Sequence, residues 1–412
     1  MTNWKKRSPQ EIQERIKAAL KQNRSFYEEP ILGMPASYLD SRIFPKDSPI
    51  LKGAPFLQTL INNPNHIGCH TLTQSEETFK GTQEIERDLL EIVACDIFKA
   101  EKGKFDGYVA SGGTEANIQA VWIYREYYKQ EFKAKHEEIV ILCSEDTHYS
   151  LSKASNLLAI DIRRIPVDPE NRNMDMQGIS LVLKESMEAG KKYIIFNCNM
   201  MTTMFGSVDN LDSVVSELEK TGLEYKIHLD CAYGGFFYPF SNPDSNLNFE
   251  HQAVTSITVD AHKMVQAPYG TGIFLIRKGF INYTHNHDAS YVKGEDYTLI
   301  GSRSGANAIA VWMILNTYGK YGWQEKSFIL KRRTDWLCEK LDELGIDYYR
   351  NSFSNIVAIK APFITKEIAE KYYLVPDNHH KPKWYKLIVM DHVDLEQLEP
   401  LLGDLSGVSE TV

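Results

Sequence analysis

Short apolar runs alternate with helix-length amphipathic segments through the middle of the chain. The runs are rich in β-branched residues and lie at 108–110, 139–143, 162–167, 193–198, 227–230 and 257–259. Because parallel strands need long crossover connections, this alternation predicts an α/β fold with a mainly parallel central sheet and helices on both faces. In such folds ligands bind beyond the carboxyl ends of the strands. Chemistry is therefore expected where these runs end.

The N-terminal segment and two later stretches have helical patterns. Ser8-Pro9-Gln10-Glu11 has the pattern of a capping box with proline at the first helical position, which predicts a short N-terminal helix. Residues 81–99 place their apolar side chains on one helical face. Residues 306–344 also have a helical pattern, and we expect a break around Gly319 and Gly322.

The end of the chain returns to a mixed pattern. Strand-like runs at 356–360 and 387–390 come before a closing helix that starts at Asp394. We therefore expect three parts, which are an N-terminal arm and helix over 1–65, a large domain over 66–305 and a small C-terminal α/β domain over 306–412.

Charge and composition favour a small-molecule substrate. The 412 residues include 46 Lys and Arg against 55 Asp and Glu, a formal net charge of −9, whereas nucleic-acid and anionic-membrane surfaces need an excess of basic residues. We expect a chain without an apolar signal segment and without a bilayer-spanning stretch. The six cysteines lie far apart, which favours reduced thiols in the cytoplasm: Cys69, Cys95, Cys143, Cys198, Cys231 and Cys338.

Two of the strand ends carry groups that could bind a cofactor. After the first run, Gly112, Gly113 and Thr114 form a small-residue turn before a helix, where backbone amides and the helix dipole favour phosphate. A simple tight turn gives the same pattern. Asp230 closes an apolar strand, where a buried carboxylate needs a cationic partner such as a protonated pyridine nitrogen. Its alternative role is to cap the next helix.

A third strand end carries an amine. The run at 257–259 leads into His262 and Lys263, so the lysine amine is expected at the carboxyl edge of the sheet, where it can form a Schiff base. A lone lysine at such a position is usually only solvated. The phosphate turn, the carboxylate and the amine follow one another along a single alternating sheet, and this combination is more informative than any one of them.

These motifs resemble those of a known family. From about Gly81 to its C-terminus the chain is similar to the group II pyridoxal-phosphate-dependent decarboxylases of the aspartate aminotransferase superfamily, fold type I. It is most like bacterial histidine decarboxylases, plant serine decarboxylases and archaeal-type tyrosine/aspartate decarboxylases. The matching stretches are Ser-Gly-Gly-Thr-Glu at 111–115, Thr-His-Tyr-Ser at 147–150, Met-Thr-Thr at 201–203 with Gly206 and Asp209, His-Leu-Asp-Cys-Ala at 228–232, Asp-Ala-His-Lys-Met at 260–264 and Gly-Ser-Arg-Ser-Gly at 301–305.

The resemblance implies pyridoxal 5′-phosphate as cofactor and four catalytic residues. Lys263 matches the lysine that carries the cofactor as an imine, and Asp230 matches the partner of the pyridine nitrogen. His148 matches the imidazole stacked on the cofactor ring. Tyr291 lies in a segment similar to the one that closes over the substrate, where its phenol would return a proton to the α-carbon.

Five further positions complete the cofactor site that the resemblance implies. Gly113, Thr114 and His262 match phosphate ligands, and Ser302 matches a residue that reaches the phosphate of the neighbouring subunit. Thr202 matches a residue that forms a hydrogen bond near the ring. The resemblance thus implies a homodimer and a large domain that binds pyridoxal phosphate.

The activity implied is decarboxylation of an L-amino acid to its amine. Two alternatives stay open, which are another fold type I reaction such as an aminotransferase or lyase, and a catalytically inactive regulatory homologue. The joint presence of Lys263, Asp230 and His148 argues against an inactive homologue, and the stacked histidine with the 301–305 motif favours decarboxylation over transamination. Among substrates, histidine, serine, aspartate, glutamate, tyrosine and diamino acids remain open.

Two positions depart from the family pattern, and the histidines do not predict a metal site. Met201 adds bulk beside Thr202 where relatives commonly have glycine, and Asp260 stands where several relatives have a small or neutral residue. His66 with His70, and His285 with His287 and Asp288, have metal-like spacing, but the first pair lacks a third ligand and the second group lies in a polar loop, so no metal site is expected.

Overall fold

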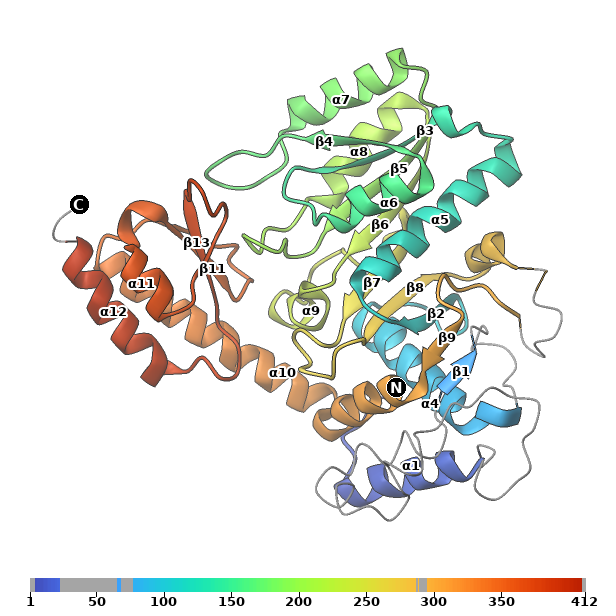
Figure 1. Cartoon of the computed structure of the whole chain (residues 1–412), viewed down its shortest axis with the longest axis horizontal. Helices are drawn as coiled ribbons and strands as arrows, with labels where there is room; N and C mark the ends of the chain where they lie inside the picture. The colour runs from blue at the N-terminus through green and yellow to red at the C-terminus, as the bar shows by residue number, and fades with distance from the viewer. Residues whose placement is uncertain (1–3, 23–64, 68–76, 287, 289–294, 410–412) are drawn as a thin grey trace. The chain divides into compact units, whose positions relative to one another are not determined.

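The computed structural model describes residues 4–22, 65–67, 77–286, 288 and 295–409, and Figure 1 labels their helices and strands. The chain divides into two compact units, each built from two separate stretches. The first unit comprises Met1–Lys135 and Asn248–Gly322, and the second comprises His136–Leu247 and Trp323–Val412. The division along the chain into an arm, a large domain and a small domain stays a prediction.

Seven strands form the central sheet, in the order β2-β8-β7-β6-β5-β3-β4. The first unit supplies β2 (Phe105–Ala110), β8 (Gly272–Arg277) and β7 (Val254–Asp260), and the second supplies β6 (Glu224–Asp230), β5 (Tyr193–Asn199), β3 (Ile139–Ser144) and β4 (Asp161–Ile165). Within the second unit all neighbouring strands run parallel, and within the first β8 runs antiparallel to both neighbours. The predicted α/β fold with its mainly parallel sheet is confirmed.

In the first unit, helices pack on one another and on the strands. The capping box is confirmed, because Ser8 N donates to Glu11 Oε2 at 2.7 Å and Glu11 N donates to Ser8 Oγ at 3.2 Å. Helix α1 packs on α4, and α5 contacts β2, β7 and β8. The elements of this unit outside the central sheet are α1 (Pro9–Gln22), β1 (Asn65–Ile67), η2 (Glu77–Phe79), α4 (Lys80–Glu91), the π-helix η3 (Ile92–Ile97), α5 (Gly113–Phe132), η6 (Phe280–Thr284) and β9 (Ser302–Ser304).

In the second unit, connecting helices lie beside the parallel strands (Figure 1). Helices α6 and α7 contact β4, and α7 packs against α8. The strands are fully buried along β3 and almost so along β5, as expected for strands covered on both faces. The elements are η4 (His136–Glu138), α6 (Ser150–Leu158), α7 (Met176–Glu188), α8 (Leu211–Thr221), η5 (Gly234–Phe236) and α9 (Tyr238–Ser241).

The long helix α10 (Gly305–Glu343) leads into the C-terminal part of the second unit. Its predicted break is at Gly319, whose φ of 63° and ψ of 175° are not helical. A side chain there would meet Lys6 N at 2.4 Å, so this position requires glycine. The elements that follow are β10 (Tyr348–Tyr349), β11 (Ile356–Lys360), η7 (Ala361–Phe363), α11 (Lys366–Lys371), β12 (Val375–Pro376), β13 (Trp384–Ile388) and α12 (Leu395–Ser409).

The C-terminal strands form a sheet of their own, in the order β10-β11-β13-β12. Its core contains Leu337 and Leu341 from α10, Val357 from β11 and Leu401 from α12. The strand predicted at 387–390 is β13, which begins earlier, at Trp384, and ends at Ile388. Strand β8 was not predicted, because it follows β7 without a helix between them and so lies outside the alternating pattern.

Candidate functional site

Lys263 lies in the turn that follows β7, in the first unit. Its amine is 3.1 Å from Asp260 Oδ2, and Asp260 is the last residue of the strand. About one third of the lysine side chain is exposed, at 32%, whereas the aspartate side chain is 4% exposed. The strand end thus carries a partly exposed amine paired with a buried carboxylate. The sequence analysis did not predict Asp260 as the partner of Lys263.

His262 lies beside the small-residue turn that begins α5. A side chain built on Gly112 would come within 4.0 Å of the His262 ring, and none of the described side chains caps the helix. Burial lowers the pKa of His262, and the Asp260 carboxylate opposes that shift. Gly113 and Thr114 open the 20-residue helix, where the first backbone N–H groups have no intrahelical partner.

Two buried polar atoms at the end of β7 lack hydrogen-bond partners within the described part of the chain. They are His262 Nδ1 and Asp260 Oδ1. Unpartnered buried polar atoms are costly, so they mark a place where a ligand completes the hydrogen bonding. A ring nitrogen beside an uncapped helix start suits a phosphate group.

The turn before α5 is held by Glu115. Its Oε2 accepts hydrogen bonds from Ser111 N at 2.6 Å and Ser111 Oγ at 2.5 Å, and Tyr108 OH donates to Oε1 at 3.0 Å. Gly112 has a φ of 154°, a conformation that favours glycine. Glu115 therefore fixes the shape of the turn.

Asp230 ends β6 in the second unit and is 7% exposed. Its Oδ1 accepts the Ala232 N–H at 3.1 Å, and its backbone carbonyl accepts the Met200 N–H at 2.9 Å. Asn199, the last residue of β5, lies opposite Asp230 in the parallel register. Two parallel strands thus end side by side on a carboxylate and an amide.

Thr202 lies in the loop after β5 and is buried. Its Oγ1 is 2.7 Å from Ser207 Oγ, and Ser207 N donates to the same oxygen at 3.2 Å. Met201 has a positive φ of 68°, at the position where the sequence departs from the family pattern. The hydroxyl of Thr202 therefore takes part in closing the 202–207 turn, and its contact with a cofactor stays a prediction.

His148 follows β3 and precedes α6. Its Nδ1 accepts the Ser150 N–H at 3.3 Å, so Nδ1 is an acceptor and the neutral ring has its proton on Nε2. The ring centroid is 4.0 Å from that of the exposed Tyr149. Thr147, the residue before it, is buried and accepts a hydrogen bond from Asn199 Nδ2 at 2.9 Å. Asn199 thereby joins the histidine loop to the strand end beside Asp230.

Ser302 and Tyr291 are the two remaining predicted residues. Ser302 is exposed on β9, opposite Ile67 of β1, and its neighbour Arg303 is buried against Glu86. Tyr291 lies outside the described residues. Within the units, the structure brings Lys263 together with His262 and the α5 turn in the first, and it connects the His148 loop with the Asp230 strand end in the second.

Asp209 is a buried carboxylate whose position sequence reasoning did not explain. Its Oδ2 accepts hydrogen bonds from Asn199 N and Asn199 Nδ2, both at 2.7 Å. Burial raises the pKa of Asp209 to about 7, although the bonds from Asn199 oppose the shift. The only sequence signal was its place in the motif that begins at Met201.

His228, two residues before Asp230, is another buried titratable group in this region. Burial lowers the pKa of His228 to about 4, against the opposing effect of the Asp230 charge. The ring is therefore neutral at pH 7 and adds no charge beside Asp230.

Comparisons with known proteins identify the family of this chain. Residues 65–344 match the pyridoxal-dependent decarboxylase conserved domain. The chain is 49% identical over 406 residues to the tryptophan decarboxylase of Clostridium sporogenes, covering 98% of this chain and 97% of that one. It is 29% identical over 354 residues to the histidine decarboxylase of Vibrio anguillarum, covering 85% of each chain. A structure of L-methionine decarboxylase from a Streptomyces species is similar in fold, with a TM-score of 0.71, 20% identity, and coverage of 97% of this chain and 94% of that one.

The chain therefore belongs to the pyridoxal-dependent decarboxylase family. It has the fold type I architecture, takes pyridoxal 5′-phosphate as cofactor and acts as an amino-acid carboxy-lyase. The residues at the end of β7 fit that cofactor. The Lys263 amine is partly exposed, the neighbouring His262 Nδ1 has no hydrogen-bond partner among the described residues, and the His262 ring lies beside the start of α5.

Proposed function

We propose that the amino acid decarboxylated by this enzyme is aromatic, with L-tryptophan preferred. The observation that carries the proposal is the 49% identity to a tryptophan decarboxylase along almost the entire length of both chains. Relatives named as histidine decarboxylases or as probable L-tyrosine/L-aspartate decarboxylases are only 27–30% identical to this chain. Tryptophan is not among the substrates considered from the sequence alone.

The proposed roles of the residues follow the chemistry of the site. Pyridoxal phosphate, when bound, supplies an electron sink for the charge left on the α-carbon as carbon dioxide leaves. Lys263 holds the cofactor covalently and His262, Gly113 and Thr114 bind its phosphate. Asp230 keeps the pyridine nitrogen protonated, because an adjacent carboxylate favours the charged form of that nitrogen.

Three further residues complete this proposal. His148 stacks on the cofactor ring and restricts how the substrate is oriented over it, and Thr202 lies beside the ring. Tyr291 delivers the proton that the α-carbon needs after carboxylate loss, since a phenol can act as a general acid. Tyr291→Phe should therefore slow amine release and raise the share of carbonyl by-product, which product analysis by mass spectrometry measures.

The assembly and location of the enzyme are part of the same proposal. We expect a homodimer in which Ser302 reaches the phosphate bound to the partner subunit, and an arrangement of arm, large domain and small domain along the chain. None of the described helices is long and apolar enough to cross a membrane, and a cytoplasmic location fits the dispersed cysteines. Sedimentation of the active enzyme tests the dimer.

A substrate panel tests the proposed function. The holoenzyme is incubated separately with L-tryptophan, L-tyrosine, L-phenylalanine, L-histidine, L-aspartate and L-methionine, and amine and carbon dioxide are measured in each. We expect equal amounts of tryptamine and carbon dioxide, and a kcat/KM for tryptophan at least about tenfold above that for histidine or aspartate, a difference worth about 1.4 kcal/mol. A preference for a non-aromatic amino acid would contradict the proposal, and Lys263→Ala is the inactive control.

A further inference from the structure

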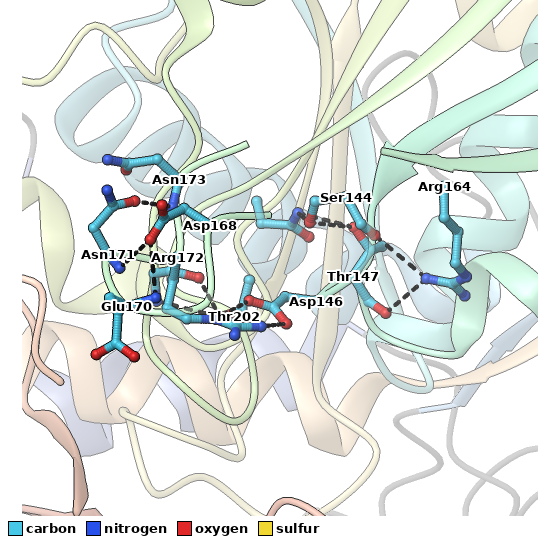
Figure 2. A network of polar contacts seen from close by, with 12 residues as sticks. Ser144, Asp146, Thr147, Arg164, Asp168, Glu170, Asn171, Arg172, Asn173 and Thr202 are labelled. Atoms are coloured by element: carbon cyan, nitrogen blue, oxygen red, sulfur yellow. Dashed lines mark hydrogen bonds and ion pairs between the residues drawn. The ribbon is translucent and has the colours of Figure 1, made fainter. Parts of the chain in front are cut away.

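The loop that carries His148, residues 144–150, is held by charged side chains as well as by Asn199. Arg164 of β4 donates from Nη1 to the backbone carbonyls of Ser144 at 3.3 Å and Thr147 at 3.4 Å. On the other side, Arg172 donates from Nε to Asp146 Oδ2 at 3.0 Å and from Nη2 to Asp146 Oδ1. Figure 2 shows both arginines directed at this loop. Asp146 is two residues before His148, so the second contact fixes the approach to the histidine.

The pair between Arg172 and Asp146 is withdrawn from solvent. Their side chains are 13% and 11% exposed, and both oxygens of the carboxylate are engaged by the guanidinium. Bidentate pairs of this kind set direction as well as distance, because the planar fork matches the carboxylate. The contact therefore restricts the position of the loop more than an exposed ion pair would.

Arg172 is itself presented by a tightly bonded turn. Asp168 Oδ1 accepts the N–H groups of Glu170 at 2.9 Å and Asn171 at 2.8 Å, and Arg172 N donates to Asp168 O at 3.0 Å (Figure 2). Arg172 has a φ of 56°, a conformation that costs a non-glycine residue free energy and so persists only where neighbours impose it. The turn thus aims the arginine at the histidine loop.

The guanidinium also connects this loop with the Thr202 turn. The Arg172 carbon Cζ lies 4.0 Å from the centroid of the Phe205 ring, in the turn closed by Thr202 and Ser207. Phe205 packs edge-on against Trp384 of β13 and Tyr349 of β10. Arg172 therefore ties the His148 loop to two other parts of the second unit at once.

We propose that Arg172 is a positioning residue for His148, acting through Asp146. The proposal rests on the proposed role of His148 as the ring that stacks on the cofactor. Without this contact the loop would keep its bonds to Arg164 and Asn199 but lose the one that constrains the residues next to the histidine. A misplacement of about 1 Å can cost roughly a hundredfold in rate, so the effect belongs to turnover more than to substrate binding.

The test compares two buried ion pairs in the same unit. Arg172→Met removes the fork but keeps an apolar chain against Phe205. The matched control is Arg350→Met, because Arg350 forms a pair with Asp335 at 2.8 Å with side chains 8% and 18% exposed. The other contacts of Arg350, with Ser354 and Cys338, also belong to the C-terminal part of the chain. Both variants should lower the melting temperature by a similar amount.

We expect only Arg172→Met to lower kcat, by roughly ten- to a hundredfold, with KM changed less than about threefold. The visible circular dichroism of the bound cofactor, which reports the setting of its ring, should change in that variant alone. Asp146→Asn should lower kcat similarly, and the double variant should be no worse than either single one, since both remove one contact. Arg172→Lys should restore part of kcat, because lysine keeps the charge without the fork.

Three outcomes would overturn the proposal. The first is a wild-type kcat in Arg172→Met. If that variant does not fold, a wild-type kcat in folded Arg172→Lys counts instead. The second is an equal loss of kcat in Arg350→Met. The third is wild-type turnover in His148→Ala, which lacks a ring that can stack and would therefore also remove the proposed role of His148. An impaired His148→Ala together with an unimpaired Arg172→Met would refute the role of Arg172 alone.

Discussion

The loop after β7 and the loop after β3 carry the two residues most characteristic of this chemistry, and they are built differently. In the first, Lys263 is partly exposed, and His262 Nδ1 and Asp260 Oδ1 have no hydrogen-bond partner within the residues the structure describes. In the second, Asp146 and Thr147 have partners on neighbouring elements, from Arg172 and Asn199. One loop needs a ligand to complete it, whereas the other is completed by the protein.

This difference separates two tasks that a cofactor enzyme must perform. A binding loop gains affinity when its polar groups are satisfied only by the ligand, because the ligand then relieves their unpaired burial. A loop that orients a ring gains precision when its own bonds are made in advance. Changes in the loop after β7 should therefore act on cofactor attachment and affinity, and changes around the loop after β3 should act on turnover and folding stability.

Lys263→Ala should give the largest effect. The variant loses the amine that holds the cofactor, and we expect turnover to fall by at least about a thousandfold, a scale typical of losing a covalent catalytic group. Steady-state amine formation measures this loss, and Lys184→Ala on α7, whose side chain is 73% exposed, is the control. Activity above about a thousandth of wild type would show that another residue carries the cofactor.

Asp230→Asn should come next. The amide keeps the volume of the side chain but cannot hold the cofactor nitrogen protonated, and each pKa unit lost by that nitrogen is worth about 1.36 kcal/mol, so we expect a loss of roughly a hundredfold in kcat. Cofactor content, measured by absorbance, should fall much less than kcat. The control is Asp212→Asn on α8, a carboxylate that accepts a hydrogen bond from Asn246 Nδ2 at 2.8 Å. An unchanged kcat in Asp230→Asn is incompatible with the proposed role.

His262→Phe should weaken cofactor binding more than folding. A hydrogen bond to a charged group contributes about 1.5–3 kcal/mol, so the dissociation constant for pyridoxal phosphate should rise about ten- to a hundredfold. The stability of the cofactor-free protein should change less than the affinity, because His262 Nδ1 has no partner to lose among the described residues and Nε2 has only a 3.7 Å contact with Asp260 Oδ2. Fluorescence titration gives the affinity. If the half-buried His251→Phe weakens binding equally, the site has been misassigned.

Asp209→Asn should give the smallest effect and a dependence on pH. The folded pKa of about 7 lies above the usual 3.8, so the folded state binds the extra proton. The contribution of Asp209 to stability is therefore fully present below about pH 4 and is lost as pH rises through about 7. The variant lacks this titration, and its stability relative to wild type should increase by on the order of 2 kcal/mol between pH 5 and 8. Urea unfolding at several pH values measures this, and a constant difference would count against a titrating Asp209.

The sequence predicts the strand-end chemistry well because strand ends are local. Lys263, Asp230 and the turn at Gly113 each follow an apolar run, so alternation alone places them at the carboxyl edge. The support around His148 could not be predicted. Arg172 reaches Asp146 across 26 residues, and Asn199 reaches Thr147 across 52. Such pairs depend on which strands become neighbours, and no local pattern encodes that order.

The most direct test is to find which lysine carries the cofactor. The holoenzyme is treated with borohydride, digested and analysed by mass spectrometry, with Lys263→Ala treated in parallel. We predict a phosphopyridoxyl group on the peptide that contains Lys263, and none on any peptide of the variant. If the wild-type enzyme carried this group on a different lysine, or on no lysine, the cofactor would not be attached at the strand end after β7.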